Sequence, residues 1–450
     1  MEIRDPVHGF IFLPHEELKI INTSIFRRLR GIKQLAMAYL VYPGATHTRF
    51  EHSLGTFHVA HRMANLLLPR EDEHDRRIVR LAALLHDIGH GPFSHVSDLV
   101  LDRFRDSERP EADRTGHEAI TLRILETNSE LIHVLGRDTI TDVVSLLRGE
   151  DTSQSIMHEM ISSGIDADKM DYLLRDSLFC GVQYGVFDLD RILNCLTRHE
   201  EQHDVHIAIE EGGVDSVEQF VFAKYFMTRQ VYAHRVRIIC DQMIARAVEL
   251  GLDEEVDFLC QLYRYRDTDE YLHNYSQWND NRMIDTILNN QKRGRCHEIF
   301  KRLHERRLFK VVFSISFKEL EGIPSPLRDR LSEILSPEEK DLKRALEYEI
   351  SRLQQLQCAP EHVIVNSRIT ESPKVMFLRS ESELQVIRKR KPSRSFGDSS
   401  PVFASISESF RDQRLDVYAP LEYESPRERD DILSSLDKEI PKLLQDAGRQ

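Results

Sequence analysis

Apolar residues recur along much of the chain with the spacing of an amphipathic helix. Ile78, Leu81, Ala82 and Leu85 stand at i, i+3, i+4 and i+7, so they form one apolar stripe on a helix. The stripe reaches His86 and stops at the glycine- and proline-containing sequence that follows. The spacing predicts a helix that ends beside His86.

The same period predicts further helices through the first 300 residues, where strand signals are few. The alternating run Val205–Ile209 ends at Gly212-Gly213 and predicts a short strand or hairpin ahead of a long helix that begins near Ser216. The other helices are expected at roughly 23–37, 51–68, 117–127, 139–148, 155–163, 167–178, 216–250 and 295–308.

The pattern changes after about residue 308. Three runs have the apolar pattern of strands and one between them has that of a helix: Lys310–Phe317, His362–Val365 and Lys374–Leu378 for the strands, and Pro337–Gln355 for the helix. Clustered Pro, Ser and Gly in Lys391–Ser400 predict a surface loop, and the tail after Ser425 has a helical pattern.

We therefore expect a mainly α protein in two parts. Residues 1–300 are predicted to form a helical domain with a short β-hairpin, and residues 301–450 a smaller α+β lobe.

Composition and charge exclude several classes of protein. Lysine and arginine total 61 against 75 acids, and this net charge of −14 disfavours a protein that coats nucleic acid with a globally basic surface. No apolar stretch approaches the ~20 residues of a membrane span, and the start of the chain lacks an apolar signal segment. The six cysteines contain no CxxC pair. We expect a cytoplasmic protein with reduced thiols.

Two local basic runs remain, and such runs are most often solvated helix faces. One is Arg388–Lys391, and the other comprises Lys292, Arg293, Arg295, Lys301, Arg302, Arg306, Arg307 and Lys310.

One set of residues has the chemistry of a metal site. His52, the His86-Asp87 pair and Asp168 each fall on a segment with a helical pattern. Imidazole and carboxylate ligands of this kind suit a divalent ion such as Mn, Mg, Fe or Zn. Taken singly, such residues are more often surface or capping residues. Two further histidines follow His86 in the run HDIGHGPFSH, a density that a solvated helix end does not require.

Several segments of the chain resemble a known family. RFEHSLG at 49–55, LLHDIGHGPFSH at 84–95 and GIDADKMDYLLRD at 164–176 look like the H…HD…D motifs of the HD-superfamily phosphohydrolases. IRDPVHGFI, FRRLRGIKQL and YPGATHTRFEHSLG resemble more closely the deoxynucleoside triphosphate triphosphohydrolase branch, which includes the vertebrate enzyme with SAM and HD domains. The resemblance implies an HD-domain helical core, with the C-terminal lobe serving assembly or regulation.

The resemblance also implies roles for individual residues. The metal ligands would be His52, His86, Asp87 and Asp168. The catalytic set would be His90, His95, Asp98, His117 and Glu118, with His95 as a candidate general acid for the leaving 5′-oxygen. Taken alone, His117 and Glu118 would be read as a helix cap.

Substrate contacts follow in the same way. Lys169, Tyr172 and Asp176 stand at i, i+3 and i+7 on the helix that carries Asp168, so they share one face. By resemblance Lys169 and Arg49 neutralise phosphates, and Tyr172 and Asp176 meet the sugar. The remaining contacts implied are Gln34 and Leu35 beside the base, Lys224 on the substrate face and Tyr232 near the sugar 2′ position.

The chain departs from the family pattern at two places. Arg30, Arg306 and Lys310 match parts of an activator nucleotide site, yet Asn22 and Arg27 replace the acid and the glutamine that read guanine there. An asparagine does not offer guanine a charged pair of acceptors. On the substrate face, Lys224 and Thr228 stand where the vertebrate enzyme has arginine and histidine.

The leading prediction is metal-dependent hydrolysis of a deoxynucleoside triphosphate to a deoxynucleoside and inorganic triphosphate. The same ligands would serve an HD nucleotidase that acts on another phosphorylated nucleotide. A third alternative is a non-catalytic sensor of nucleotides or single-stranded nucleic acid. By resemblance the chain is expected to form a homo-oligomer, either a dimer or a tetramer, and not to bind membranes.

Overall fold

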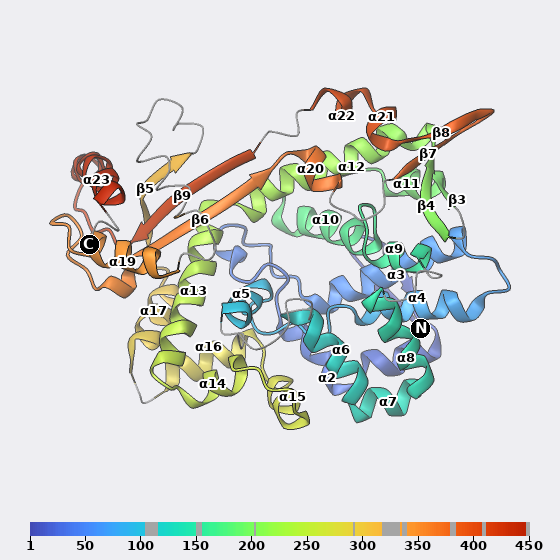
Figure 1. Ribbon diagram of the computed structural model, residues 1–450. Helices are drawn as coiled ribbons and strands as arrows, with labels where there is room; N and C mark the ends of the chain where they lie inside the picture. Colours follow the sequence, from blue (N-terminus) through green and yellow to red (C-terminus); the bar gives the residue numbers. More distant parts are fainter. Residues whose placement is uncertain are drawn as a thin grey trace.

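In the part of the chain that it describes, the computed structural model is mainly helical with three small β-sheets (Figure 1). It describes residues 1–103, 116–149, 155–201, 204–290, 293–316, 334, 340–378, 384–406 and 411–446. Phe317, Pro337 and Lys292, which belong to predicted elements or basic runs, lie outside the described residues. The expected fold class, mainly α with a β-hairpin and an α+β C-terminal region, is confirmed. The division at residue 300 stays a prediction.

The chain begins with a hairpin of β1 (Glu2–Asp5) and β2 (Gly9–Phe12) and continues into a series of helices. These are α1 (His15–Ile21), α2 (Ser24–Arg27), α3 (Arg49–Leu67), α4 (Glu73–Leu85), α5 (His95–Arg103), α6 (His117–Thr127), α7 (Ser129–Leu135), α8 (Arg137–Arg148), α9 (Ser155–Ile161), α10 (Ala167–Cys180), α11 (Leu189–Cys195), α12 (Val214–Met227), α13 (Arg235–Asp253), α14 (Asp257–Tyr263), α15 (Asp269–Tyr275), α16 (Asp280–Asn289) and α17 (Arg295–His304).

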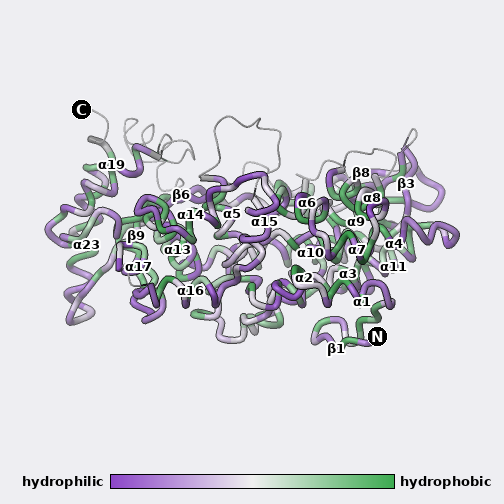
Figure 2. The backbone as a smooth tube through the Cα atoms, turned by 90° about the horizontal axis from the view of Figure 1, so that it is seen from below, coloured by the Kyte–Doolittle hydropathy of each residue, from purple (hydrophilic) through white to green (hydrophobic). Residues whose placement is uncertain are grey.

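Helix α3 packs against both α4 and α10 in the helical region. The predicted stripe of α4 is buried in the hydrophobic core, with Ile78, Leu81, Ala82 and Leu85 almost inaccessible to solvent. Hydrophilic stretches follow the periphery, for example along α4's outer end and near α23 (Figure 2). Among the described residues, no helix combines the length and the hydrophobicity needed to cross a lipid bilayer.

A four-stranded sheet lies at one end of the molecule (Figure 1). Its order is β3 (Leu196–Glu201), β4 (Asp204–Glu210), β7 (Gln385–Arg388) and β8 (Lys391–Ser395). The predicted hairpin is therefore present as β3 and β4, which pair antiparallel with Leu196 opposite Ile209. Strand β4 also pairs in parallel with β7, so a C-terminal segment completes a sheet begun in the helical region.

A second hydrophobic core lies at the other end of the molecule. Strand β9 (Arg411–Ala419) is the centre of an antiparallel sheet between β5 (Lys310–Ser316) and β6 (Ile364–Glu371). Helices α19 (Lys340–Ser351) and α23 (Pro426–Asp446) supply Leu346, Leu436 and Ile440 to this core. The predicted strand at Lys310 and the predicted helices around residue 345 and after Ser425 are confirmed in their described parts.

The structure corrects two C-terminal predictions. Lys374–Leu378 is not a strand but belongs to helix α20 (Pro373–Leu378), whose Phe377 packs in the main core. Ser372 accepts the backbone N–H of Val375 and caps the helix, and proline suits its first position. Lys391–Ser400 is not a surface loop, because it forms β8 and α21 (Phe396–Ser399), and its last residue, Ser400, caps α22 (Pro401–Ser405). The sequence of β8 is polar and does not alternate between apolar and polar residues, so its strand conformation depends on antiparallel pairing with β7.

Two predicted helices are also shorter than expected. The helix expected over 23–37 ends at Arg27, and a 3₁₀ turn (Arg28–Gly31) and a loop follow. The helix expected over 216–250 is divided into α12 and α13 by a π turn (Thr228–Tyr232). His234 then accepts the backbone N–H of Val236 at the start of α13.

Candidate metal centre and active site

Four predicted metal ligands converge from three helices. His52 lies on the first turns of α3, His86 caps the C-terminal end of α4, Asp87 follows it, and Asp168 lies at the start of α10. The His52 Nε2 atom lies 3.0 Å from Asp168 Oδ1 and 3.5 Å from Asp87 Oδ2. The His86 Nε2 atom lies 3.3 Å from Asp87 Oδ1 and 3.6 Å from Asp168 Oδ1. Sequence positions 116 residues apart therefore meet at one point.

The second nitrogen of each imidazole explains why the first faces this point. The His86 Nδ1 lies 2.8 Å from the carbonyl oxygen of Ala83, and the His52 Nδ1 lies 2.8 Å from Asp171 Oδ2. Both neighbours are acceptors, so each Nδ1 carries a proton. The two Nε2 atoms are buried and have no hydrogen-bond partner among the described residues. Two orphaned nitrogens and two carboxylates fit a divalent cation.

Neighbouring charges set the protonation of this group. Burial alone would raise the pKa of Asp87, but the Arg49 guanidinium and the adjacent histidines hold it well below its usual range. Burial would lower the pKa of His52, yet Asp168 and Asp171 raise it to about 10. A divalent cation at this point would displace any proton from the His52 Nε2 atom, because a histidine binds a metal ion in its neutral form.

A second cluster contains the predicted catalytic histidines. His90 stacks on His117 with ring centroids 3.6 Å apart and an angle of 14° between the planes. The Asp98 Oδ2 lies 2.9 Å from His117 Nδ1 and 3.2 Å from His95 Nδ1. His90 Nε2 lies 3.3 Å from Asp87 Oδ1 and joins the two clusters. Burial would lower the pKa of His117, but its hydrogen bond to the Asp98 carboxylate raises the pKa above its usual value.

The loop between these histidines is anchored by distant helices. Arg28 donates to the carbonyl of Ile88 at 2.8 Å, and the Tyr275 hydroxyl donates to the carbonyl of Gly89 at 2.9 Å. A Cβ at Gly89 would lie 2.3 Å from the carbonyl oxygen of His117, so only glycine allows α6 to approach. The backbone of the histidine loop is therefore fixed from several sides.

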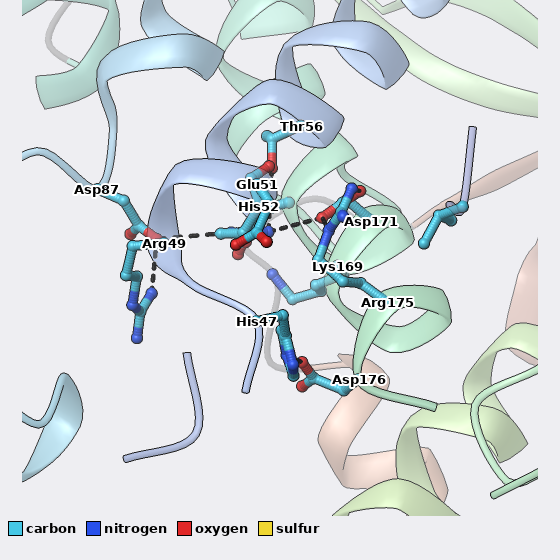
Figure 3. Close-up of polar contacts among 12 residues, drawn as sticks. His47, Arg49, Glu51, His52, Thr56, Asp87, Lys169, Asp171, Arg175 and Asp176 are labelled. Carbon is cyan, nitrogen blue, oxygen red and sulfur yellow. Dashed lines mark hydrogen bonds and ion pairs between the residues drawn. The ribbon is translucent and has the colours of Figure 1, made fainter. Parts of the chain in front are cut away.

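The predicted sugar contacts form a third group, two turns along α10 from Asp168. The Asp176 Oδ2 accepts the Tyr232 hydroxyl proton at 2.7 Å, and its Oδ1 lies 2.7 Å from His47 Nε2. The Tyr172 ring lies between the clusters, 6.5 Å from the His52 ring and 6.2 Å from the Tyr232 ring. Figure 3 shows His47 and Asp176 below His52, with Lys169 between them.

The remaining substrate residues surround this group. Lys169 donates to Asp166 at 2.6 Å, and Lys224 donates to the carbonyl of Met376 at 3.3 Å. Gln34 and Leu35 are both buried, and the Gln34 backbone N–H donates to the carbonyl of His47 at 3.0 Å. Thr228, a departure from the family pattern, donates its hydroxyl proton to the Lys224 carbonyl at 2.8 Å.

The predicted activator residues make separate contacts. The exposed Arg30 guanidinium lies 3.5 Å from the centre of the Phe50 ring, and Arg306 donates to the carbonyl of Leu40 at 3.1 Å. Lys310 is exposed at the start of β5, and Glu118 is exposed in the first turn of α6. The roles predicted for Arg30, Arg306, Lys310 and Glu118 therefore stay predictions.

Sequence reasoning missed several residues that complete the site. His47, Asp171 and Arg175 lie inside motifs that carry the resemblance but received no role, and Asp280 lies outside all of them. The signal for His47 was present, because it is one more histidine five residues before His52.

Comparisons with known proteins agree with this geometry. The family model described as the HD domain matches residues 49–176, and the model described as the HD-associated region matches residues 187–437. The chain belongs to the HD-domain family. Every predicted metal ligand lies inside the HD domain match, whereas Lys224, Tyr232 and Asp280 lie in the HD-associated region.

Individual relatives are more distant. An uncharacterized protein of Methanocaldococcus jannaschii is 38% identical over 255 residues, which are 56% of this chain and 50% of that protein. Human deoxynucleoside triphosphate triphosphohydrolase SAMHD1 is 31% identical over 346 residues, which are 69% of this chain and 54% of that protein. The chain thus spans about half the length of the curated relatives it matches. A solved phosphohydrolase from Bacteroides thetaiotaomicron has a TM-score of 0.71 and 25% identity, over 93% of this chain and 99% of that one.

Proposed function

We propose that this protein is a metal-dependent phosphohydrolase that acts on deoxynucleoside triphosphates and releases a deoxynucleoside and inorganic triphosphate. The observation that carries the proposal is the layout of α10. One face of this helix presents Asp168 to the two histidines and, two turns further on, Asp176 to Tyr232. A metal-centred hydrolytic site and a candidate sugar site are therefore adjacent. The similarity to SAMHD1 supports the substrate class, and the phosphohydrolase with the same fold supports the reaction class.

Phosphate chemistry needs a cation, positive side chains and a proton donor. A divalent ion bound by His52, His86, Asp87 and Asp168 would polarise a phosphate oxygen and make water a better nucleophile. Arg49 and Lys169 lie beside this set and supply positive charge for the transferred phosphate. Asp98 also raises the pKa of His117, which favours the protonated form of this imidazole.

The leaving 5′-oxygen must receive a proton when its bond to the α-phosphorus breaks. His95 is the most exposed histidine of the second cluster, with 63% of its side chain accessible, and Asp98 orients its Nδ1. The opposite ring nitrogen is then available to a substrate. We assign the general acid role to His95 and an electrostatic role to the buried His90 and the partly buried His117.

Tyr232 and Asp176 would select the sugar. Their 2.7 Å hydrogen bond holds the Tyr232 ring next to Tyr172, which in turn lies beside His52, and a ribose 2′-hydroxyl would meet the Tyr232 ring there. Gln34 and Leu35, which are buried beside His47, would border the base.

Regulation is a separate part of the proposal. An activator nucleotide site in a homodimer or homotetramer would include Arg30, Arg306 and Lys310. This site would not prefer guanine, because Asn22 and Arg27 replace the residues that read that base. Light scattering of the protein with and without nucleotide tests this point, and a monomer under both conditions contradicts it.

The decisive experiment identifies the products. The protein and its Asp87→Ala variant are incubated with each deoxynucleoside triphosphate alone and with all four together, with Mg²⁺ or Mn²⁺, and products are separated by ion-exchange chromatography. Deoxynucleoside and intact triphosphate, absent with the variant, support the proposal, and turnover only in the mixture indicates an activator. Stepwise loss of phosphate would instead indicate a nucleotidase. Salt-sensitive binding of oligonucleotides without turnover would indicate a sensor.

A further inference from the structure

A buried network of charged side chains lies behind His52, on the side away from Asp87 (Figure 3). The His52 Nδ1 lies 2.8 Å from Asp171 Oδ2. Arg175 forks onto the same carboxylate, with Nε donating to Oδ2 and Nη2 donating to Oδ1, each at 2.9 Å. The His8 Nε2 lies 2.7 Å from Oδ1. Four contacts therefore occupy the lone-pair positions of the Asp171 carboxylate.

The N-terminal hairpin supplies the outer half of this network. Asp5, at the end of β1, accepts from Arg175 Nη1 at 2.9 Å through Oδ2. Its Oδ1 accepts the backbone N–H groups of Val7 and His8, both at 2.9 Å, and so shapes the turn. The His8 ring also packs against the His58 ring, with centroids 5.0 Å apart. One buried carboxylate thus connects the turn of the hairpin to the guanidinium.

Helix α3 approaches the network so closely that one position on it has no room for a side chain. A Cβ at Gly55 would lie 1.8 Å from Asp171 Oδ1 and 2.4 Å from Arg175 Nη2. Glycine is unfavourable inside a helix, so this close approach explains its presence within α3. The position of His52 and the position of the network are therefore coupled through the same stretch of backbone.

We infer that Asp5, His8, Arg175 and Asp171 are positioning residues of the metal centre, and that the N-terminal hairpin is part of that centre although it lies outside the HD domain match. The inference rests on the proposed function in one respect, that the His52 cluster binds a divalent metal ion. A carboxylate on Nδ1 keeps a proton there, fixes the ring and directs the Nε2 lone pair to the cation. Arg175 holds that carboxylate by a bidentate contact, and Asp5 holds Arg175.

The charge state of Asp171 agrees with this arrangement. Burial alone would raise the pKa of its carboxyl, but Arg175 and the hydrogen bonds from His52 and His8 hold the pKa well below its usual range.

Substitutions that keep the shape of the hairpin test the inference. Asp5→Asn leaves an oxygen for the turn but places an amide N–H₂ against Arg175 Nη1. Glu2→Gln is the matched control, because it removes the same charge from an exposed position on the same strand. Asp171→Asn removes the negative charge and replaces one of the two acceptor oxygens with an N–H₂ donor. His8→Phe keeps a ring packed on His58 but loses the contact with Asp171. The dissociation constant for Mn²⁺ is measured by electron paramagnetic resonance of the free ion, and folding by circular dichroism and thermal melting of the metal-free protein.

We expect Asp171→Asn to raise the Mn²⁺ dissociation constant roughly 10–100-fold. Asp5→Asn and His8→Phe should raise it by smaller factors, and Glu2→Gln should leave it unchanged. If Asp171→Asn fails to fold, the two hairpin variants carry the test. Folded hairpin variants that melt earlier but bind Mn²⁺ as the wild type does would overturn the inference, as would equal weakening by Glu2→Gln. A wild-type protein that binds no Mn²⁺ would overturn the proposed metal site itself and this inference with it.

Discussion

The Arg49 guanidinium donates to the Asp87 carboxylate at 2.5 Å, and both side chains are buried. Arg49 was predicted to neutralise substrate phosphates, and the structure gives it a second partner. Its Nε donates to Ser94 at 3.0 Å, while its Nη2 has no hydrogen-bond partner among the described residues. The same side chain therefore holds a proposed metal ligand in place and has one N–H donor left over, which the proposed phosphate contact would use.

Replacing Arg49 should make folding depend on the metal. In Arg49→Met the Asp87 carboxylate loses its buried partner, and breaking such a pair costs about 3–5 kcal/mol. A cation at the site would compensate, so we expect a large loss of thermal stability in a chelator and a smaller one in excess Mn²⁺. Arg27→Met, at an exposed position on α2, is the control. If Arg49→Met loses the same thermal stability with and without Mn²⁺, the proposal that a cation binds beside the Asp87 carboxylate is contradicted.

The sugar selectivity should depend on the ring of Tyr232 more than on its hydroxyl. Tyr232→Ala opens the space beside Tyr172, so we expect the preference for deoxyribonucleotides over ribonucleotides, measured as the ratio of kcat/KM values, to fall on the order of tenfold or more. Tyr232→Phe keeps the ring and should retain most of the preference while losing the hydrogen bond to Asp176. Unchanged selectivity in Tyr232→Ala would exclude the proposed role.

Local pattern predicted the parts of the site that one helix or one short loop carries. The stripe ending at Leu85 predicted the helix that presents His86, and the spacing of Lys169, Tyr172 and Asp176 predicted one face of α10. Both predictions depend only on the helical period, and the resemblance added the roles.

Contacts between distant segments could not be predicted in this way. Directly after Gly31 the chain is no longer helical. There the Lys33 backbone N–H donates at 3.0 Å to Asp280, which lies 247 positions after Lys33. The Asp5–Arg175 contact joins residues 170 positions apart, and no spacing rule relates them. Lys374–Leu378 is short enough for its apolar residues to fit a strand as well as a helix, and packing against α12 decides in favour of the helix.

Lys224 should impart a pH dependence to substrate capture. Burial and the nearby Lys169 ammonium lower the pKa of Lys224 to about 8. An amine is charged below its pKa, so the positive charge is present at pH 7 and is lost as the pH rises through 8. If Lys224 binds phosphate, kcat/KM should fall above pH 8 with a limiting slope of about tenfold per pH unit.

An arginine at this position removes the ionisation. Lys224→Arg stays charged throughout the range, so its profile of kcat/KM between pH 6.5 and 9.5 should lack the decline near pH 8. Lys19→Arg, at an exposed position on α1, should retain it. A decline that persists in Lys224→Arg would assign the ionisation to another group.

Asp280 should affect turnover without touching any proposed ligand. Its carboxylate accepts the backbone N–H of Phe93 at 2.7 Å and that of Lys33 at 3.0 Å, so it ties the histidine loop to the segment that precedes Gln34. Phe93 and Ser94 both have positive φ angles, of 64° and 54°, which non-glycine residues rarely adopt without support from their surroundings.

Asp280→Ala removes both hydrogen bonds and leaves two buried donors unpaired, which costs about 1–3 kcal/mol for each donor. The positive φ angles then lose part of their support, and His95 shifts relative to the metal centre. We therefore expect a lower melting temperature together with a lower kcat, and a smaller change in KM. Asp285→Ala, an exposed acid on the same helix, is the control for both measurements. A destabilised Asp280→Ala protein with the wild-type kcat at a temperature where it is fully folded would show that the loop keeps its position without this carboxylate.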